Sequence, residues 1–535
     1  MKKTIEEMME EDAARMPQKA APKFDTNETF SDTEADLFQL ADDSDLKAKI
    51  EEWKKVRTYP ILGKLRDHQW RALVEADEKE GHAWFMDPGA GKTLTAIAEA
   101  GRLYEMGKAD GAIVMAPNGP HKQWLDEQFP KWAGYRWEGI HNKMPPVKGI
   151  KAFMDRRITA MGVLCINYES IATAKGQRLL DQFIEKFPRI YLIADESQKI
   201  KDWRSARSKD ALKLALRAAY RRVLSGTPIL KGLEDLWTQY EFCEPGLAWP
   251  LVPISVNHRG TLDRDGFMGY RAHYCKIVPQ HKLKNAHPAA IIISGYKHED
   301  HLRERVKGHS TRVMSDEFMV GEKPDFIKVS TPMTDDQARE YRRMEEHLIS
   351  MFDEEVITAQ NALVQLGKLL QIASGFIMDE ERDVKNLGGN KVNAAMTLIE
   401  QMDEPFIIWT PFIPLRQMII NKLYEEGLAK HVYGKDAVEA WKKDDNGILV
   451  GNQSSGLGVG MNLQHAAANI YLANNFSAEA RWQSLKRTDR IGQTRQVRNW
   501  DLIAPDTVDE EVLQNLAQKQ DISRMTIDEL RNMIC

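Results

Sequence analysis

The chain has no long hydrophobic run and few cysteines, and both absences exclude classes of protein. No stretch reaches the roughly 18 consecutive apolar residues that a membrane-spanning helix needs. Met1–Asp12 is acidic and has no apolar core, so a secretory signal is not expected. The four cysteines are scattered without CxxC spacing, which disfavours a zinc site or a disulfide framework: Cys165, Cys243, Cys275 and Cys535. We therefore expect a cytoplasmic protein without a membrane partner.

The chain also lacks a net positive charge, since 74 Lys and Arg stand against 79 Asp and Glu. This balance does not exclude nucleic-acid binding, because the negative excess lies in the first 50 residues. They hold 13 acidic and 7 basic residues, a net of −6, and the total of −5 leaves +1 for residues 51–535. Basic residues cluster at Lys199–Arg222, with nine, and at Arg481–Arg498, with six. Each cluster is either a solvated helix face or part of a nucleic-acid surface.

The pattern of apolar residues predicts an α/β protein with two or three domains. Residues 1–50 are acidic and short of apolar periodicity, which indicates a mostly disordered tail. Short apolar runs then alternate with amphipathic segments such as Thr93–Glu105 and Ser208–Tyr220. The runs predict buried strands at Ala112–Ala116, Val163–Ile166, Tyr191–Ala194 and Arg222–Ser225. This alternation is typical of a parallel sheet covered on both faces.

A second lobe of the same kind is expected after about residue 331. The intervening residues 240–330 are irregular and rich in proline, which predicts an insertion or helical protrusion, and residues 335–375 have a helical pattern. Strand-like runs return at Phe406–Trp409, Gly447–Val450, Asn469–Leu472 and Asn499–Ile503.

A glycine-rich segment, Gly89-Ala90-Gly91-Lys92-Thr93, precedes one predicted helix and suits phosphate binding. Glycines let the backbone approach phosphate oxygens, and the helix N-terminus adds partial positive charge. Lys92 would reach the β- and γ-phosphates of ATP, and the Thr93 hydroxyl would ligate Mg²⁺. The strict pattern has glycine at position 86, where this chain has Met86. The alternative is a glycine-rich turn that caps a structural helix.

Two adjacent carboxylates, Asp195 and Glu196, follow the apolar run Ile190–Ala194. At the carboxyl edge of a parallel sheet, Asp195 can hold Mg²⁺, and Glu196 can orient and deprotonate an attacking water. The alternative is a pair of solvated acids at a strand end.

Two weaker motifs complete the first half of the chain. Ser225-Gly226-Thr227-Pro228 ends a strand with small hydroxyl residues that could relay the nucleotide state to a bound nucleic-acid strand. Gln69 carries a carboxamide that can pair with an adenine edge. A plain turn and a surface glutamine are the respective alternatives.

Arg487 and Arg490 stand three residues apart, so they are predicted to share one face of a helical turn. Planar guanidinium groups presented in this way are suited to the charge of a transition-state phosphate. Together with Asp87–Thr93, the glycine-rich segment and the two residues before it, called the phosphate loop below, they predict an ATPase whose site is completed across two lobes. Taken alone, the pair is equally a solvated helix face.

The order of these motifs resembles superfamily 2 helicases, and within them the Swi/Snf-type DNA translocases. The resemblance covers roughly residues 60–520, and its most specific elements are Gly458-Val459-Gly460-Met461-Asn462-Leu463 and Arg487…Arg490-Ile491-Gly492-Gln493. Gln198 stands where many relatives carry His. The absence of accessory domains in the sequence makes the chain look like a minimal bacterial or phage member.

The resemblance implies two RecA-like lobes with helical protrusions between them and ATP bound in the cleft. The expected parts are an acidic, mostly disordered tail (1–55), the ATP-binding lobe 1 (56–240), its insertion or protrusion (241–330), the protrusion of lobe 2 (331–385), lobe 2 (386–505) and a C-terminal brace helix (506–535). By position, the residues that would bind nucleotide are Gln69, Gly89, Ala90, Gly91, Lys92, Thr93 and Gly458. Asp195 and Glu196 would supply the magnesium site and activate water. Arg487 and Arg490 would be arginine fingers from the second lobe. Segments around Ala116–Trp124, Ser225–Pro228 and Ser454–Leu463 would track the backbone of duplex DNA.

The function expected from this resemblance is ATP-dependent translocation on double-stranded DNA by a monomer that uses ATP and Mg²⁺. One alternative is a strand-separating DNA or RNA helicase with the same ATPase. The other is a non-catalytic DNA-binding scaffold with a degenerate ATPase fold.

Overall fold

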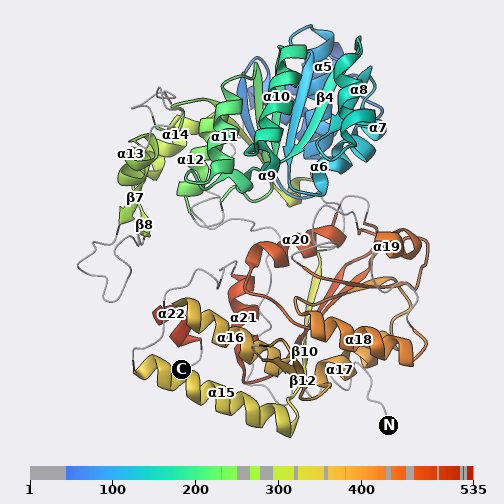
Figure 1. Ribbon diagram of the computed structural model, residues 1–535, viewed down its shortest axis with the longest axis vertical. Coiled ribbons are helices and arrows are strands. Elements are labelled where there is room, and N and C mark those ends of the chain that lie inside the picture. The colour runs from blue at the N-terminus through green and yellow to red at the C-terminus, as the bar shows by residue number, and fades with distance from the viewer. Residues whose placement is uncertain are drawn as a thin grey trace. The chain divides into compact units, whose positions relative to one another are not determined.

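The computed structural model describes residues 44–229, 232–249, 265–277, 293–318, 323–354, 359–379, 381–428, 435–453, 463–490, 493–518, 522 and 527–533. The chain divides after Phe318 into two compact units, and each has its own sheet and core (Figure 1). No helix of the described ranges is both long enough and apolar enough to cross a membrane.

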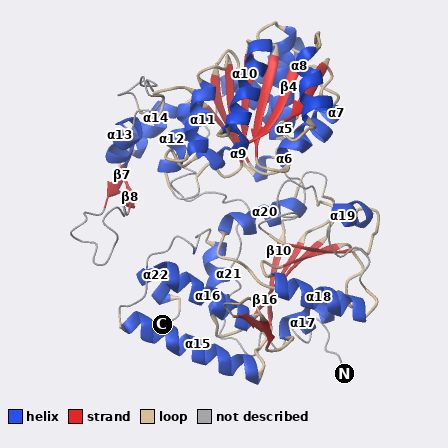
Figure 2. Cartoon of the chain, viewed as in Figure 1, coloured by secondary structure: helices blue, strands red, loops and turns tan. Residues whose placement is uncertain are grey.

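The first unit is built on a seven-stranded parallel sheet in the order β3-β4-β2-β5-β6-β1-β9. Its strands are β1 (Gly81–Met86), β2 (Gly111–Ala116), β3 (Trp137–His141), β4 (Met161–Asn167), β5 (Ile190–Asp195), β6 (Tyr220–Ser225) and β9 (Ser310–Val313). The central strands are buried along their whole length, because helices cover both faces of the sheet (Figure 2). This explains their near-continuous apolar sequences.

Helices cover the two faces in separate groups. α10 (Ala174–Lys186), α11 (Ala206–Ala215) and α12 (Glu234–Cys243) supply the core on one face, where Phe85, Ile113 and Leu192 meet Phe183 and Tyr240. Helices α4 (Asp67–Ala76) and α5 (Lys92–Glu105) pack against each other and belong to the other group. Shorter helical segments complete the connections: α6 (Pro120–Gln123), η1 (Trp124–Gln128), α7 (Phe129–Trp132), η2 (Pro146–Lys151), α8 (Ala152–Asp155), α9 (Tyr168–Ile171) and η3 (Ser197–Ile200).

The segment predicted as an irregular insertion contributes to both sheets. It contains α13 (Asp265–Tyr274), the antiparallel strands β7 (Cys275–Ile277) and β8 (Ile293–Tyr296), α14 (Glu299–Val306) and the turn η5 (Ser315–Glu317). Between α14 and η5, β9 returns to pair with β1. After η5, β10 (Asp325–Ser330) pairs with β16 (Arg498–Ile503) of the second unit. The structure therefore differs from the expected 241–330 insertion at its last strands. Both strands carry charged or hydroxyl residues, so they lack the apolar runs that marked the others.

The second unit has a five-stranded parallel sheet in the order β10-β16-β15-β13-β14. The remaining strands are β13 (Phe406–Trp409), β14 (Ile448–Gly451), β15 (Ala468–Tyr471) and β16 (Arg498–Ile503). Its helices are α15 (Asp335–Asp353), α16 (Ala359–Ala373), α17 (Asn390–Ile399), α18 (Ile413–Glu425), α19 (Lys435–Trp441), α20 (Ala478–Thr488), α21 (Val508–Ala517) and α22 (Ile527–Asn532), with a small hairpin of β11 (Phe376–Met378) and β12 (Val384–Asn386). The expected class, two α/β lobes with RecA-like parallel sheets, is confirmed by these topologies.

The structure adds detail to two local predictions. Ser44–Val56, at the end of the tail expected to be mostly disordered, forms helix α3. Ile50 and Trp53 of α3 pack on Val74 of α4, a small apolar contact that straddles the expected end of the tail. The helix predicted over 208–220 ends at Ala215, because Tyr220 already belongs to β6. Residues 1–43 lie outside the described residues.

Candidate nucleotide-binding site

The loops with predicted chemistry follow the carboxyl ends of strands in the first unit's sheet. β1 leads into the phosphate loop at Asp87, β5 ends at Asp195, and β6 ends at Ser225. Because β6 lies between β1 and β5, these three ends are neighbours at one edge of the sheet. A Cβ atom added to Gly226 would lie 2.7 Å from the Pro88 side chain, so the loop after β6 touches the phosphate loop. The fold therefore brings the three predicted motifs together.

The phosphate loop has the backbone shape that its glycines permit. Gly89 and Gly91 have φ values of 94° and 85°, in the left-handed region that favours glycine. Helix α5 begins at the next residue, Lys92, so the partial positive charge of its N-terminus is presented at the loop. Lys92 Nζ donates to the Met86 carbonyl oxygen at 2.7 Å. Thr93 follows as the second residue of α5.

The structure explains why Met86 can replace the glycine of the strict pattern. Met86 is the last residue of β1, fully buried and paired with Val313 of β9. Extended backbone places no demand for glycine. The turn itself starts one residue later, at Asp87.

Helix α4 presents two side chains to the phosphate loop. Gln69 Oε1 accepts from the Arg66 backbone nitrogen at 2.9 Å, and Gln69 Nε2 donates to the Gly91 carbonyl oxygen at 3.2 Å. His68 Nε2 lies 2.8 Å from the Ala90 carbonyl oxygen, which can only accept, so this nitrogen carries the proton. Burial lowers the pKa of His68, and the imidazole is neutral at pH 7. Gln69 thus lies at the loop, with its carboxamide hydrogen-bonded to the Gly91 carbonyl oxygen.

Asp195 lies in a setting that favours proton uptake unless positive charge is near. Burial and the neighbouring Glu196 carboxylate raise the pKa of Asp195 to about 6. A hydrogen bond from Trp124 Nε1 to Asp195 Oδ2, at 2.8 Å, and the charge of Lys92 both oppose this rise. Tyr168 Oη also donates to the Asp195 backbone carbonyl, at 2.8 Å. A carboxylate oxygen so placed beside Lys92 suits a hard cation such as Mg²⁺.

Glu196 has an unusual backbone conformation, and its carboxylate takes part in a series of side-chain hydrogen bonds. Its φ of 53° is left-handed, which costs a non-glycine residue on the order of 1–3 kcal/mol and is common at functional sites. Gln198 Nε2 donates to Glu196 Oε2 at 2.8 Å, and Gln198 Oε1 accepts from Ser225 Oγ at 2.7 Å. The Thr227 backbone nitrogen donates to the same Ser225 oxygen at 3.0 Å. The carboxylate after β5 is therefore connected to the loop after β6.

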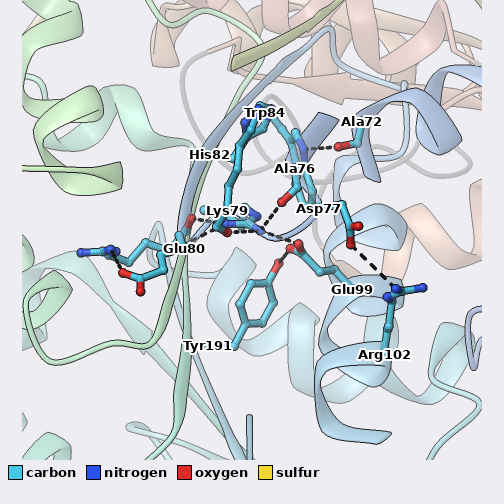
Figure 3. Close-up of polar contacts among 12 residues, drawn as sticks. Ala72, Ala76, Asp77, Lys79, Glu80, His82, Trp84, Glu99, Arg102 and Tyr191 are labelled. Carbon is cyan, nitrogen blue, oxygen red and sulfur yellow. Dashed lines mark hydrogen bonds and ion pairs between the residues drawn. The ribbon is translucent and has the colours of Figure 1, made fainter. Parts of the chain in front are cut away.

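A buried ionic cluster fixes the helix that carries Lys92 and Thr93. Glu99 of α5 accepts from Arg222 of β6 at 2.5 Å and from Tyr191 Oη of β5 at 2.7 Å. Figure 3 shows Tyr191 and Glu99 pointing toward one another. Arg222 also donates to the Ala76 and Lys79 carbonyl oxygens, at 3.3 and 3.1 Å, which ties in the end of α4. Removing one partner of such a pair leaves a buried charge, so the cluster is expected to be essential for folding.

The two predicted finger residues, Arg487 and Arg490, lie in the second unit. The prediction that they share one face of a helix is wrong. α20 ends at Thr488, so Arg487 occupies its last turn while Arg490 lies beyond it. The reason is the non-helical backbone of Asp489, whose carboxylate pairs with Lys486 at 2.9 Å. Gln493 anchors the chain beyond α20. Its Nε2 donates to the carbonyl oxygens of Gln464, Ala466 and Thr488 at 2.9, 2.8 and 3.2 Å. Gly458 lies outside the described residues.

The sequence motifs do not predict the contacts of several residues. His68 precedes Gln69, Trp124 lies in the segment expected to track DNA, and Arg481 lies upstream of the two predicted finger residues. Arg481 is buried and makes a bidentate pair with Asp501, at 2.8 and 2.7 Å. No sequence pattern marks the Trp124–Asp195 contact, which joins residues 71 apart.

Comparison with known proteins finds one family model and several relatives. Residues 66–251 match the model of the SNF2-related domain. The chain is 22% identical over 544 residues to a mouse protein named DNA excision repair protein ERCC-6-like, a match that covers 88% of this chain and 42% of that protein. It is 24% identical over 485 residues to protein p41 of Acyrthosiphon pisum secondary endosymbiont phage 1, covering 85% and 96% of the two chains. Over residues 66–251 the chain is therefore similar to the SNF2-related domain, in line with the order of its sequence motifs.

A solved Swi/Snf-type structure is also similar. The Sulfolobus solfataricus SWI2/SNF2 ATPase core in complex with dsDNA has 22% identity and a TM-score of 0.38, with 89% of this chain and 98% of that chain covered. The chain spans less than half the length of the mouse relative but nearly the whole length of the phage relative.

Proposed function

We propose that the chain is a DNA-dependent ATPase that uses ATP hydrolysis to move along double-stranded DNA. The observation that carries this proposal is the meeting of the phosphate loop, Asp195-Glu196 and Ser225-Thr227 at one edge of a parallel sheet. Loops at the carboxyl edge of such sheets bind ligands in many α/β proteins. The choice of duplex DNA rests on the Swi/Snf-type family and on the dsDNA bound by the Sulfolobus relative named above.

Each residue has a proposed role in hydrolysis. The Gly89–Gly91 backbone and Lys92 bind the phosphates, while Gln69, at the loop, is proposed to recognise the adenine. Glu196 orients the attacking water and accepts its proton. Arg487 and Arg490 stabilise the charge that develops on the transferred phosphoryl group.

The proposed metal is Mg²⁺, and the donor set fits it. Thr93 supplies a hydroxyl and Asp195 a carboxylate, both hard oxygen ligands. When bound, Mg²⁺ neutralises charge on the phosphate oxygens. The chain's own contribution is to keep the Asp195 carboxylate ionised and aligned, through Trp124 Nε1 and the nearby Lys92.

The experiment that tests this proposal is ATPase activity measured with duplex DNA, single-stranded DNA and RNA. We expect the largest stimulation with duplex DNA, and displacement of the third strand from a triplex as the chain moves. Glu196→Gln should bind a fluorescent ATP analogue and fail to hydrolyse ATP. Stimulation only by single strands, together with unwinding of duplexes, would instead support the strand-separating helicase. Absence of nucleic-acid-stimulated hydrolysis would support the scaffold.

The remaining assignments are also proposals. The first unit is proposed to be the ATP-binding lobe, and α21 to be part of the brace. The protein is proposed to act as a monomer in the cytoplasm of a bacterium, as a bacterial or phage-encoded protein, which the near full-length match to the phage protein supports.

A further inference from the structure

The segment Arg312–Phe318, called the tether below, is bonded to the first residue of the phosphate loop. Asp87 has a completely buried carboxylate. Its Oδ1 accepts from Arg312 Nη2 at 2.6 Å, and its Oδ2 accepts from both the backbone nitrogen and Oγ of Ser315 at 2.9 Å. A buried carboxylate is tolerated only with such charge-assisted partners, so this contact is specific and strong.

Backbone hydrogen bonds align the same two chain segments. The Asp87 nitrogen donates to the Val313 carbonyl oxygen at 2.9 Å, and Arg312 Nη1 donates to the carbonyl oxygens of Phe85 and Val313 at 2.7 and 2.8 Å. The guanidinium thus spans the ends of β1 and β9. The phosphate loop therefore cannot change its entry angle without disturbing the start of the tether.

The end of the tether reaches the middle of the phosphate loop by a second route. The Phe318 ring packs against the His68 ring with a centroid distance of 5.2 Å, and His68 Nε2 donates to the Ala90 carbonyl oxygen at 2.8 Å. Glu317 pairs with Arg71 of the same helix, α4, at 2.7 Å. The tether is thus attached to the loop at Asp87 directly and at Ala90 through His68.

The tether is also the point at which the chain leaves the first unit. The unit ends at Phe318, and the next described strand, β10, belongs to the sheet of the second unit. A shift of the phosphate loop on nucleotide binding would therefore act on a segment only a few residues from the second unit's edge strand. Rigid, packed elements transmit small shifts in this way when they have two arrangements.

We propose that Arg312, Ser315 and Phe318 are positioning residues that transmit the nucleotide state of the phosphate loop to the chain entering the second unit. This inference rests on the proposed function, because it requires nucleotide at the loop. The residues act through Asp87 and His68 and do not themselves contact the nucleotide.

The test is amide hydrogen exchange with and without Mg·ADP, followed by mass spectrometry. Peptides from the start of α5 report binding itself, and peptides from β10 report transmission. In the wild type we expect both to change. In Ser315→Ala and Phe318→Leu, which are small changes, we expect the α5 response to remain and the β10 response to fall by more than half. DNA-stimulated turnover should drop at least about fivefold while the affinity for ADP stays within about twofold.

Arg221→Lys is the matched control. Arg221 pairs with Glu80 at 3.0 Å, next to the start of β1 and away from the phosphate loop. Loss of this ion pair therefore reports a general weakening of the sheet. A wild-type β10 response in both tether variants would overturn the proposal, as would a β10 response that is absent from the wild type while α5 responds. No response at α5 in the wild type would instead overturn nucleotide binding, and with it the proposed function.

Discussion

Gln198 donates from Nε2 to Glu196 Oε2 at 2.8 Å while its Oε1 accepts from Ser225 Oγ at 2.7 Å. One carboxamide thus joins the proposed catalytic carboxylate to the loop proposed to follow DNA. Many relatives are expected to carry histidine at this position. The Gln198 carboxamide makes both contacts and does not itself titrate, unlike an imidazole.

Replacing Gln198 by leucine should uncouple hydrolysis from DNA. The variant loses the donor to half-buried Glu196 and the acceptor for buried Ser225. Leaving such a group without its partner costs about 1–3 kcal/mol, or roughly 5- to 150-fold in rate. We expect ATP binding to persist and duplex-stimulated ATPase to fall by about that factor. Gln177→Leu is the control, since Gln177 of α10 donates to the carbonyl oxygen of Ile171 at the end of α9 and not to a residue of the site. Equal stimulation in Gln198→Leu and the wild type would contradict the role.

Replacing Trp124 by phenylalanine should raise the Mg²⁺ requirement. The ring is kept and only the Nε1 donor to Asp195 is lost, so the Asp195 pKa rises further above about 6. A raised carboxyl pKa means more proton bound at a given pH, so the defect should grow as pH falls from 8 to 6. Half-saturation by Mg²⁺ should increase about tenfold, in ATPase and in the binding of a fluorescent ADP alike.

Trp132→Phe provides the comparison for this change. Trp132 Nε1 donates to Gln128 Oε1 at 3.3 Å in the same stretch of chain but does not contact the site. If both tryptophan variants shift the Mg²⁺ dependence equally, the Trp124 contact has no special part in holding Asp195.

A buried acid in the first unit should make stability depend on pH. Glu241 of α12 accepts from the Gly246 nitrogen with both oxygens at 3.0 Å, yet burial raises its pKa from 4.5 to about 8. The folded state therefore holds one proton more than the unfolded state between these values, and stability falls as pH rises through them. The loss is at most about 4–5 kcal/mol.

Glu241→Gln should remove this dependence, because the amide cannot ionise and its oxygen can still accept from Gly246. Urea unfolding at pH 5, 7 and 9 measures it, with half-exposed Glu244→Gln as the control. The Glu241 variant should be more stable than the wild type at pH 9 and little different at pH 5. Parallel pH curves for the variant and the wild type would show that Glu241 is ionised in the folded state.

Most of the two sheets could be predicted from the sequence, because strands buried on both faces carry continuous apolar runs such as Ala112–Ala116 and Phe406–Trp409. The strands β9 and β10 were not predicted, because Ser310–Val313 and Asp325–Ser330 mix charged and hydroxyl residues with few aliphatic ones. Such strands are specified by pairing with β1 and β16, which local composition does not encode.

The candidate site divides in the same way. The glycines, Lys92 and Asp195-Glu196 were predictable, because phosphate and metal chemistry demand those residue types at fixed spacing. The supporting contacts were not, since Trp124–Asp195 and Arg312–Asp87 join distant segments and involve residue types with many other uses. The end of α20 was missed because its arginine spacing suits a helix, whereas the Lys486–Asp489 pair and Gln493 stabilise a turn.

The end of α20 gives the final prediction, because Arg487 lies inside this helix and Arg490 lies beyond it. Arg487→Ala or Arg490→Ala should retain ATP binding and lose turnover, with an expected loss of about 10³–10⁵ for a finger residue. Arg495→Ala is the control, since Arg495 is exposed and donates only to the His465 carbonyl oxygen among the contacts found in the described residues. Turnover near the wild-type value would contradict the finger assignment.

Gln493→Ala separates the two arginines. Its carboxamide donates to three carbonyl oxygens, and its backbone nitrogen donates to the Arg490 carbonyl oxygen at 2.9 Å, so Gln493 helps to hold Arg490 in place. Arg487 remains in the last turn of α20, which Gln493 contacts only at Thr488. Gln493→Ala should therefore lower turnover in the wild type and change little in a protein that already carries Arg490→Ala. It should still reduce the residual turnover of Arg487→Ala, because there it disturbs the finger that remains.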